Sequence, residues 1–230
     1  MTAVHAIRLG HTNVFLLRGE GPGVLVDAST PGTEGKFFKA LKRLGVTPTE
    51  VRCIVVTHGH LDHVGSLKAI QKATGAPVVM HKLEAAAVAR GEHSIPPGTS
   101  AWGKVLGGLF RMAQRSSRYE AVKAKMTIDA AMSLGPFGIA GRVIPTPGHT
   151  RGSLSVVLES GEALVGDLAM NGLPMRIGPG MPTFAEDVNA VYASWEKILL
   201  AGAKTIYPAH GKPFGAERLK KVLDQRRTGT

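Results

Sequence analysis

The sequence of 230 residues contains a single cysteine, Cys53. One thiol excludes an intramolecular disulfide framework and a zinc site built from several cysteines. The sequence has no apolar run near the roughly 18 residues that a membrane-spanning helix needs. Residues 1–10 also lack the apolar segment of a secretory signal. We therefore expect a cytoplasmic protein with no transmembrane segment.

Aromatic and acidic residues are also scarce. The chain has 7 Phe, 3 Tyr and 2 Trp, and its 28 Lys+Arg outnumber 17 Asp+Glu to give a net charge of +11. This charge allows an anionic substrate or RNA as a partner. However, the sequence has no nucleic-acid-binding motif and no aromatic platform for stacking bases. We expect a solvated basic surface and a small-molecule substrate instead of nucleic acid.

Short apolar runs alternate with helix-like stretches along the chain. The runs predict strands at 4–9, 13–17, 24–28, 51–56, 77–80, 127–134, 139–144, 154–158, 163–165 and 204–207. Helices are predicted at 33–44, 64–74, 188–199 and around 219–223. Each half of the chain thus has several strands followed by helices. This layout favours an α/β fold in which two sheets pack face to face with helices outside, in one domain over residues 1–230.

Residues 93–126 do not fit this alternation. They combine apolar residues with an excess of basic ones, namely Trp102, Leu106, Leu109, Phe110, Met112 and Tyr119 with Lys104, Arg111, Arg115, Arg118, Lys123 and Lys125. We expect an inserted helical segment with a basic face. We favour a role for this segment as a lid over the site or as a homodimer contact, and a contact with a membrane surface is the less favoured alternative. The Met- and Gly-rich stretch 172–182 is a further candidate for a pocket-lining loop.

The run His58-Gly59-His60-Leu61-Asp62-His63 directly follows a predicted buried strand. Alternate residues of an extended chain point to the same side, so His58, His60 and Asp62 should share a side. His63 should fall at the turn into the next helix. Imidazole and carboxylate groups at this spacing are typical ligands of Zn²⁺ and other first-row metal ions.

Three later residues occupy similar positions after predicted strands. His149 lies in the rigid turn 145–150, Asp167 follows the strand at 163–165, and His210 follows the strand at 204–207. A lone histidine is more often structural than a ligand. One candidate at each of three strand ends, where α/β proteins tend to place their sites, instead indicates one shared metal site.

These motifs resemble those of the metallo-β-lactamase-fold superfamily of metallohydrolases. The resemblance rests on the 58–63 run, Pro147-Gly148-His149-Thr150, Gly166-Asp167 and His210-Gly211. It implies an αββα sandwich of two mixed β-sheets flanked by helices, and a binuclear centre. The implied roles are His58, His60 and His149 on one metal, Asp62, His63 and His210 on a second, and Asp167 bridging both. Zinc is the expected metal, with iron or manganese as alternatives.

The implied reaction is hydrolysis. Two ions about 3.5–4 Å apart can share a hydroxide, lower its pKa and polarise the bond under attack. Asp62 is the expected catalytic residue, because it would orient that hydroxide. The motifs favour a glyoxalase II-like or lactonase-like enzyme that cleaves an ester, thioester or lactone. A mononuclear-iron persulfide dioxygenase of the same fold, and a phosphodiesterase, RNA-processing nuclease or RNA-binding protein, remain alternatives.

Overall fold

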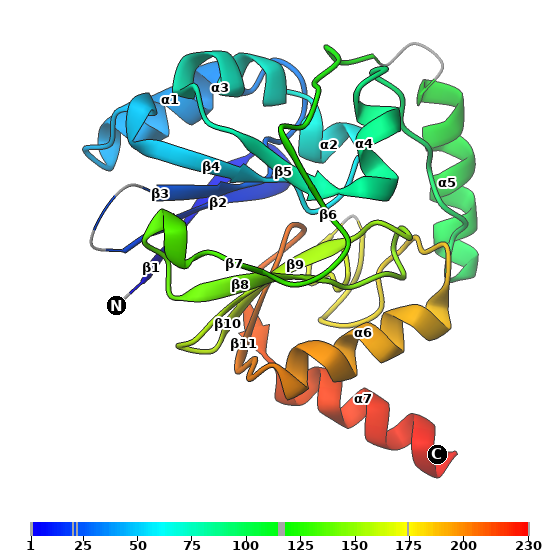
Figure 1. Cartoon of the computed structure of the whole chain (residues 1–230). Coiled ribbons are helices and arrows are strands. Elements are labelled where there is room, and N and C mark those ends of the chain that lie inside the picture. The colour runs from blue at the N-terminus through cyan, green and yellow to red at the C-terminus, as the bar shows by residue number, and fades with distance from the viewer. Residues whose placement is uncertain (1, 20, 22, 115–117, 174, 230) are drawn as a thin grey trace.

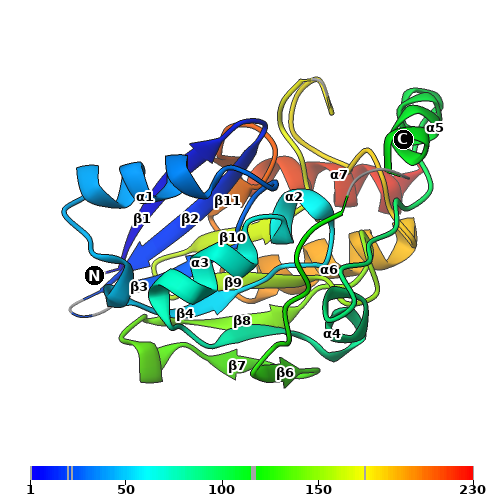
Figure 2. The same ribbon diagram turned by 90° about the horizontal axis from the view of Figure 1, so that it is seen from above.

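Two six-stranded sheets lie face to face in the computed structural model, with helices on their outer sides (Figure 1). The structure describes residues 2–229 except 20, 22, 115–117 and 174. Seen from above, the sheets and helices form stacked layers (Figure 2). This arrangement confirms the predicted αββα sandwich of two mixed sheets.

The first sheet has the strand order β1-β2-β3-β4-β5-β6. Its strands are β1 (Ala3–Leu9), β2 (Thr12–Arg18), β3 (Gly23–Val26), β4 (Val51–Val55), β5 (Val78–His81) and β6 (Met126–Ile128). The pairs from β1 to β3 are antiparallel and those from β3 to β6 are parallel. Between these strands lie the helices α1 (Glu34–Arg43), α2 (Leu61–Val64), α3 (Leu67–Thr74), α4 (Lys82–Val88) and α5 (Ala101–Gln114), and the 3-10 turn η1 (Pro48–Glu50).

The second sheet has the order β12-β11-β10-β9-β8-β7. Its strands are β7 (Met132–Ser133), β8 (Gly141–Pro145), β9 (Leu154–Leu158), β10 (Glu162–Gly166), β11 (Thr205–Pro208) and β12 (Phe214–Gly215). Among the described strands of this sheet, β10 and β11 pair in parallel and the other neighbours pair antiparallel. The 3-10 turn η2 (Gly135–Phe137) and the helices α6 (Val188–Leu200) and α7 (Glu217–Thr228) complete this half.

Buried side chains form three apolar layers, one between the sheets and one under the helices of each half. The central strands contribute to two layers at once, which explains their nearly continuous apolar sequences. In β4, Cys53 faces the layer between the sheets and Ile54 faces the helices. Cys53 is fully buried and acts as an apolar core residue, as the sequence indicates.

The prediction of one strand at 127–134 is wrong. Met126–Ile128 pairs with β5 in the first sheet, whereas Met132–Ser133 pairs with β8 in the second. The chain passes from one sheet to the other between these two short strands, so a single strand cannot span both. Residues 127–134 have the local propensity of a strand, but their two ends pair with strands of different sheets.

The prediction of one helix at 64–74 is also wrong. The structure has α2 and α3 here, separated at Gly65 and Ser66. A Cβ built on Gly65 would lie 2.2 Å from Cδ of Pro31, and the Ser66 hydroxyl donates to the Thr30 carbonyl over 2.6 Å. These close contacts with the segment after β3 interrupt the helix.

The segment 93–126 contains one helix, α5, at the edge of the molecule beside both layers (Figure 1). Residues 93–100 and 118–125 carry no helix, so the helix occupies the middle part of the segment. Lys104 and Arg111 are exposed, as a basic face requires, and Arg115 lies outside the described residues. In the part of the chain that the structure describes, no helix is long and apolar enough to cross a membrane.

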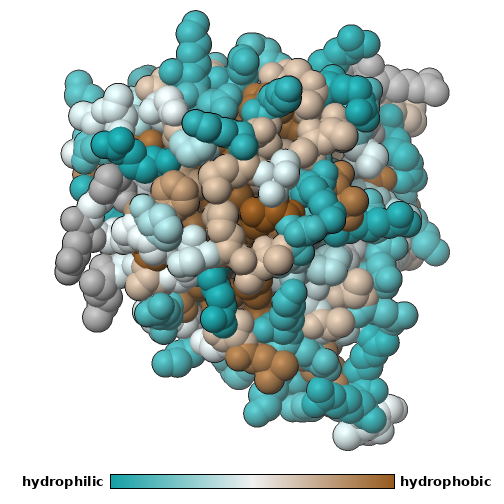
Figure 3. Space-filling model, viewed as in Figure 1, coloured by the Kyte–Doolittle hydropathy of each residue, from teal (hydrophilic) through white to brown (hydrophobic). Residues whose placement is uncertain are grey.

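Hydrophilic residues dominate the rim of the face in Figure 3, and apolar residues gather near its centre.

Candidate metal centre

Loops that follow strands of both sheets bring the seven predicted site residues together. His58 follows β4, and His60 immediately precedes α2. Asp62 and His63 lie inside α2. The second sheet contributes His149 from the β8–β9 turn, Asp167 after β10 and His210 after β11. Three donor groups result, each with its ligand atoms within 4.8 Å of one another: His58, His60 and His149; His58, His63 and Asp167; and Asp62, His63 and His210.

The expected alternation of His58, His60 and Asp62 is wrong in part. His58 and His60 do share one donor group, but Asp62 belongs to the group around His63 and His210. The extended conformation ends where α2 begins at Leu61, so Asp62 follows a helical spacing. His63 likewise lies within the helix instead of before it.

Three imidazoles form the first group with almost equal spacing. Nε2 of His149 lies 3.1 Å from Nε2 of His58 and 3.0 Å from Nδ1 of His60. The remaining pair, Nε2 of His58 and Nδ1 of His60, is also 3.0 Å apart. Tetrahedral Zn²⁺ with Zn–N bonds of about 2.0–2.1 Å requires N–N distances of roughly 3.3 Å. The three nitrogens therefore fit one face of a tetrahedral metal site.

Carboxylates and two further imidazoles form the second side of the centre. Nε2 of His210 lies 3.0 Å from Oδ2 of Asp62 and 3.4 Å from Oδ1 of Asp167, and Nε2 of His63 lies 3.3 Å from the same Asp167 oxygen. Oδ2 of Asp167 faces the first group, 3.6 Å from Nε2 of His149. One carboxylate thus reaches both groups.

Orphaned polar atoms test whether this cluster fits a metal. Nε2 of His63, Nε2 of His210 and Oδ1 of Asp167 are buried and have no partner of hydrogen-bond geometry among the described residues. Buried polar atoms are rarely left in this state without a ligand. Divalent ions held between these atoms would satisfy them, so the residues fit metal binding.

Hydrogen bonds on the outer side fix which imidazole nitrogens face the centre. Nδ1 of His149 donates to the carbonyl of Phe184 over 2.7 Å, and Nδ1 of His210 donates to the carbonyl of His11 over 3.0 Å. Nδ1 of His63 donates to the Asp27 carboxylate over 2.8 Å. Because these nitrogens carry the protons, Nε2 of each ring keeps its lone pair for a metal.

The electrostatics divides the histidines into two classes. Burial lowers the pKa of His58 and His149, and lowers the pKa of His60 to about 3, so these rings are held neutral. Burial also disfavours the charged forms of His63 and His210. The carboxylates of Asp27 and Asp167 nevertheless hold the pKa of His63 well above its usual value, and Asp167 raises the pKa of His210 to about 10. Without metal, protons on these two rings balance the carboxylates.

Asp27 and Glu84 support the centre, and neither is predicted from the sequence. Asp27 accepts hydrogen bonds from the Thr57 backbone and hydroxyl as well as from His63, and it adopts φ of 65°. Its place at the end of β3 is the signal that could have found it, since Asp167 follows a strand in the same way. Glu84 accepts from the backbone of Gly59 and from the Thr150 hydroxyl, which ties two ligand loops together. No local pattern marks it.

A cavity of 450 Å³ opens beside the candidate centre. Its wall includes His60, Asp62, His149, Asp167 and His210, together with residues from the 93–126 segment. Met175 also lines the cavity, as expected for the loop 172–182, in which residue 174 lies outside the described residues. A small molecule in this cavity would lie against the candidate metal ligands.

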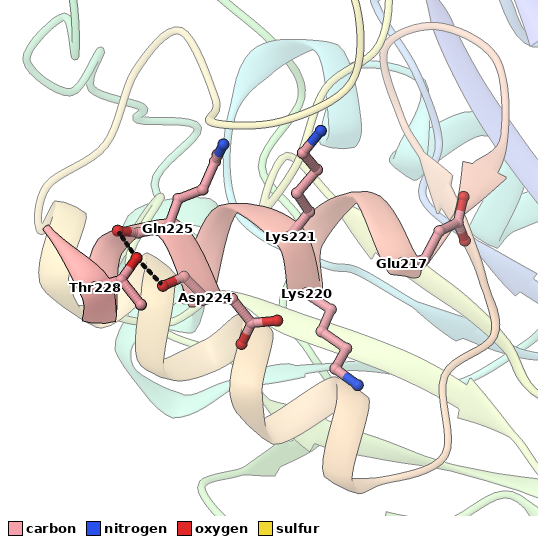
Figure 4. A pocket seen from close by; sticks show the side chains of 6 residues that line it. All are labelled: Glu217, Lys220, Lys221, Asp224, Gln225 and Thr228. Carbon is pink, nitrogen blue, oxygen red and sulfur yellow. Dashed lines mark hydrogen bonds between the residues drawn. The ribbon is translucent and has the colours of Figure 1, made fainter. Parts of the chain in front are cut away.

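A second depression, of 340 Å³, lies along α7. Figure 4 shows its side chains, which include the acidic Glu217 and Asp224 and the basic Lys220 and Lys221. The two lysines point in different directions, and Thr228 donates to backbone carbonyls of its own helix. These charges do not converge on one point, so this surface offers no second candidate site.

Comparisons with known proteins agree with the geometry. The family model of the metallo-beta-lactamase superfamily matches residues 7–210. The probable metallo-hydrolase YflN of Bacillus subtilis (strain 168) is 26% identical and matches 96% of this chain and 89% of its own length. Metallo-beta-lactamase domain-containing protein 1 of Rattus norvegicus is 29% identical and matches 86% of this chain and 64% of its own length.

Solved structures share the fold at low identity. The BLEG-1 B3 metallo-beta-lactamase superposes with a TM-score of 0.71 at 22% identity, covering 95% of this chain and 97% of its own. A metallo-beta-lactamase family protein from Thermus thermophilus gives a TM-score of 0.70 at 21% identity, covering 99% of this chain and 79% of its own. The chain therefore belongs to the metallo-β-lactamase superfamily of metallohydrolases.

Proposed function

We propose that this protein is a binuclear metal-dependent hydrolase that cleaves an ester, thioester or lactone bond. The observation that carries the proposal is the carboxylate of Asp167 between two donor groups, with one oxygen near His149 and the other near His63 and His210. Such an arrangement matches a bridging ligand. His58, His60 and His149 would hold one ion, and Asp62, His63 and His210 would hold the other. Zinc suits this mixture of imidazoles and carboxylates.

When bound, such a metal pair supplies an activated water for attack and polarises the scissile bond. The chain's own residues would position the reactants. The Asp62 carboxylate lines the cavity and its side chain is 29% exposed, whereas the bridging candidate Asp167 is buried. Asp62 is therefore placed to accept a hydrogen bond from the attacking water and orient it towards the substrate.

Two features weigh against the alternatives. A mononuclear dioxygenase needs a single set of ligands, and the second donor group around His210 would then have no role. A nuclease needs cationic groups to hold phosphates. The lining of the cavity that the structure describes contains no lysine or arginine.

Metal analysis of the purified protein tests the proposal. We expect about two zinc ions per chain and hydrolysis of a simple ester such as p-nitrophenyl acetate. His149→Ala should empty one metal position and abolish turnover while the protein stays folded by circular dichroism. His5→Ala, in β1 and outside the centre, is the matched control and should keep both metals. One iron per chain with oxygen uptake on persulfides, or full turnover in His149→Ala, would overturn the proposal.

A further inference from the structure

The cavity beside the candidate centre has two kinds of wall. The metal-capable side chains lie on one side together with residues 10–12 of the β1–β2 hairpin. The remaining lining is dominated by apolar side chains, namely Leu61, Ile95, Pro96, Phe110, Met175 and Phe184. Three of these six come from the segment 93–126. Pockets of about 300–1,000 Å³ with an apolar lining and few polar groups are typical of small-molecule sites.

The positive charge of the chain does not extend into this cavity. No lysine or arginine belongs to its lining among the described residues. Lys104 and Arg111 of α5 are exposed, although Phe110 of the same helix lines the cavity. An anionic group in the cavity would therefore find no fixed cation apart from the metals, whereas an apolar group would be removed from water.

We propose that the substrate is a neutral ester or lactone with an apolar acyl chain, and that Phe110 determines the preference for that chain. This inference rests on the proposed hydrolase function and deepens it. The carbonyl lies at the metal centre, and the acyl chain extends along the wall formed by Phe110, Phe184 and their apolar neighbours.

Backbone contacts at and just before the start of α5 hold residues 97–103 against residues 183–185. The backbone of Thr99 donates to the carbonyl of Thr183 over 2.9 Å, and Ala185 donates to the carbonyl of Pro97 over 3.0 Å. A Cβ built on Gly103 would lie 2.5 Å from the Thr183 carbonyl oxygen, so α5 packs directly on this segment. The wall therefore does not need to be ordered when a ligand binds, which favours affinity.

Phe184 connects this wall to the metal centre. Its ring lies 6.0 Å from that of Phe110, and its carbonyl accepts the hydrogen bond from Nδ1 of His149. An acyl chain against the two rings is thus one residue away from a candidate metal ligand. This proximity lets chain binding position the carbonyl for attack.

A chain-length series tests the proposal on the zinc-loaded protein. The substrates are the p-nitrophenyl esters of acetate, butyrate, hexanoate and octanoate. Burial of each methylene should raise kcat/KM by about fourfold until the cavity is filled. Phe110→Ala should lower kcat/KM for the octanoate ester at least tenfold more than it lowers kcat/KM for the acetate ester. For the octanoate ester, kcat/KM of Phe110→Leu should lie between those of Phe110→Ala and the unchanged protein.

The matched control is Leu109→Ala, one position away on the same helix. Leu109 is 58% exposed and does not line the cavity, so its removal should leave the whole series unchanged. Equal kcat/KM for all four esters would overturn the inference. An equal loss on acetate and octanoate in Phe110→Ala would overturn it as well.

Binding to the metal-free protein gives a readout that does not depend on turnover. Octanamide, which has the acyl chain without a cleavable ester, should bind in isothermal titration calorimetry, and Phe110→Ala should weaken it about tenfold. If octanamide binds but no ester is cleaved, the proposed hydrolase function fails and the apolar site stands. If the acetate ester is cleaved but octanamide does not bind, the present inference fails alone.

Discussion

Replacement of Asp27 by asparagine tests how the candidate second metal position is organised. The carboxylate accepts from the Thr57 backbone over 2.8 Å on one oxygen and from Nδ1 of His63 over 2.8 Å on the other. Asparagine keeps the shape but offers only one acceptor oxygen, and its amide nitrogen is a donor. In either orientation of the amide, the Thr57 N–H or the His63 Nδ1–H loses its acceptor.

Asp27→Asn should weaken metal binding more than it destabilises the fold. If the amide nitrogen faces His63, Nδ1 must become the acceptor and the proton moves to Nε2, the atom that faces Asp167. A protonated nitrogen cannot bind a metal. Removal of such an outer hydrogen bond typically lowers metal affinity 10- to 100-fold, or roughly 1.4–2.7 kcal/mol. Asp27→Ala should also destabilise the fold by about 2–6 kcal/mol, since at least two buried donors, the Thr57 N–H and the His63 Nδ1–H, then lose this acceptor.

Competition with a chromogenic chelator measures the affinity of each metal in turn. In Asp27→Asn we expect one zinc to bind 10- to 100-fold more weakly and the other to keep its affinity. Asp129→Asn is the matched control, because Asp129 is exposed, pairs with Lys82 and lies outside the candidate centre. Two zinc affinities that are both unchanged in Asp27→Asn would refute the reasoning.

Three further predictions concern stability and reactivity. In Gly148→Ala the new Cβ would lie 2.5 Å from a backbone nitrogen of α6, whereas Gly45, also at positive φ, has open space around it. The free energy of unfolding in urea should therefore be at least about 2 kcal/mol lower for Gly148→Ala than for Gly45→Ala. Equal free energies of unfolding for the two variants would contradict this. Burial raises the pKa of Cys53 to about 12, so Ellman's reagent should react with it only after unfolding; rapid reaction of the native protein would disprove burial. In the metal-free protein, the unfolded state binds more protons at His60 below pH 6.5, and the native state binds more at His210 from pH 6.5 to about 10. The thermal midpoint in EDTA should therefore be highest near pH 6.5 and fall on both sides, and a midpoint that rises steadily from pH 5 to 9 would be inconsistent with these pKa values.

Local sequence patterns predicted the parts of the structure that local physics determines. The apolar runs predicted most strands, and the 58–63 run indicated the site, because its residues are neighbours in the chain. His149, Asp167 and His210 could be added because each follows a strand. The structure brings these residues together, and their roles as ligands stay a prediction that metal analysis tests.

Features that depend on distant partners could not be predicted from local sequence. Glu84 accepts hydrogen bonds from Gly59 and Thr150, which lie 25 and 66 positions away, so no local sequence pattern predicts its role. The division of residues 127–134 between two sheets depends on which strand lies alongside, not on strand propensity. The interruption at Gly65 depends on the approach of Pro31. In each case the deciding contact comes from elsewhere in the chain.

The hairpin of β1 and β2 holds the loop that carries His210. The backbone of Asn13 donates to the carbonyl of Ala209, its side chain donates to the carbonyl of Gly211, and the His11 carbonyl accepts the hydrogen bond from His210. During synthesis on the ribosome, residues 11–13 emerge almost 200 positions before this loop. The centre can then be assembled only after residues 209–211 have been synthesised, and until then these groups of the β1–β2 hairpin lack their partners in the loop that carries His210. Long-range closure of this kind slows folding and makes chaperone protection of the unfinished chain valuable.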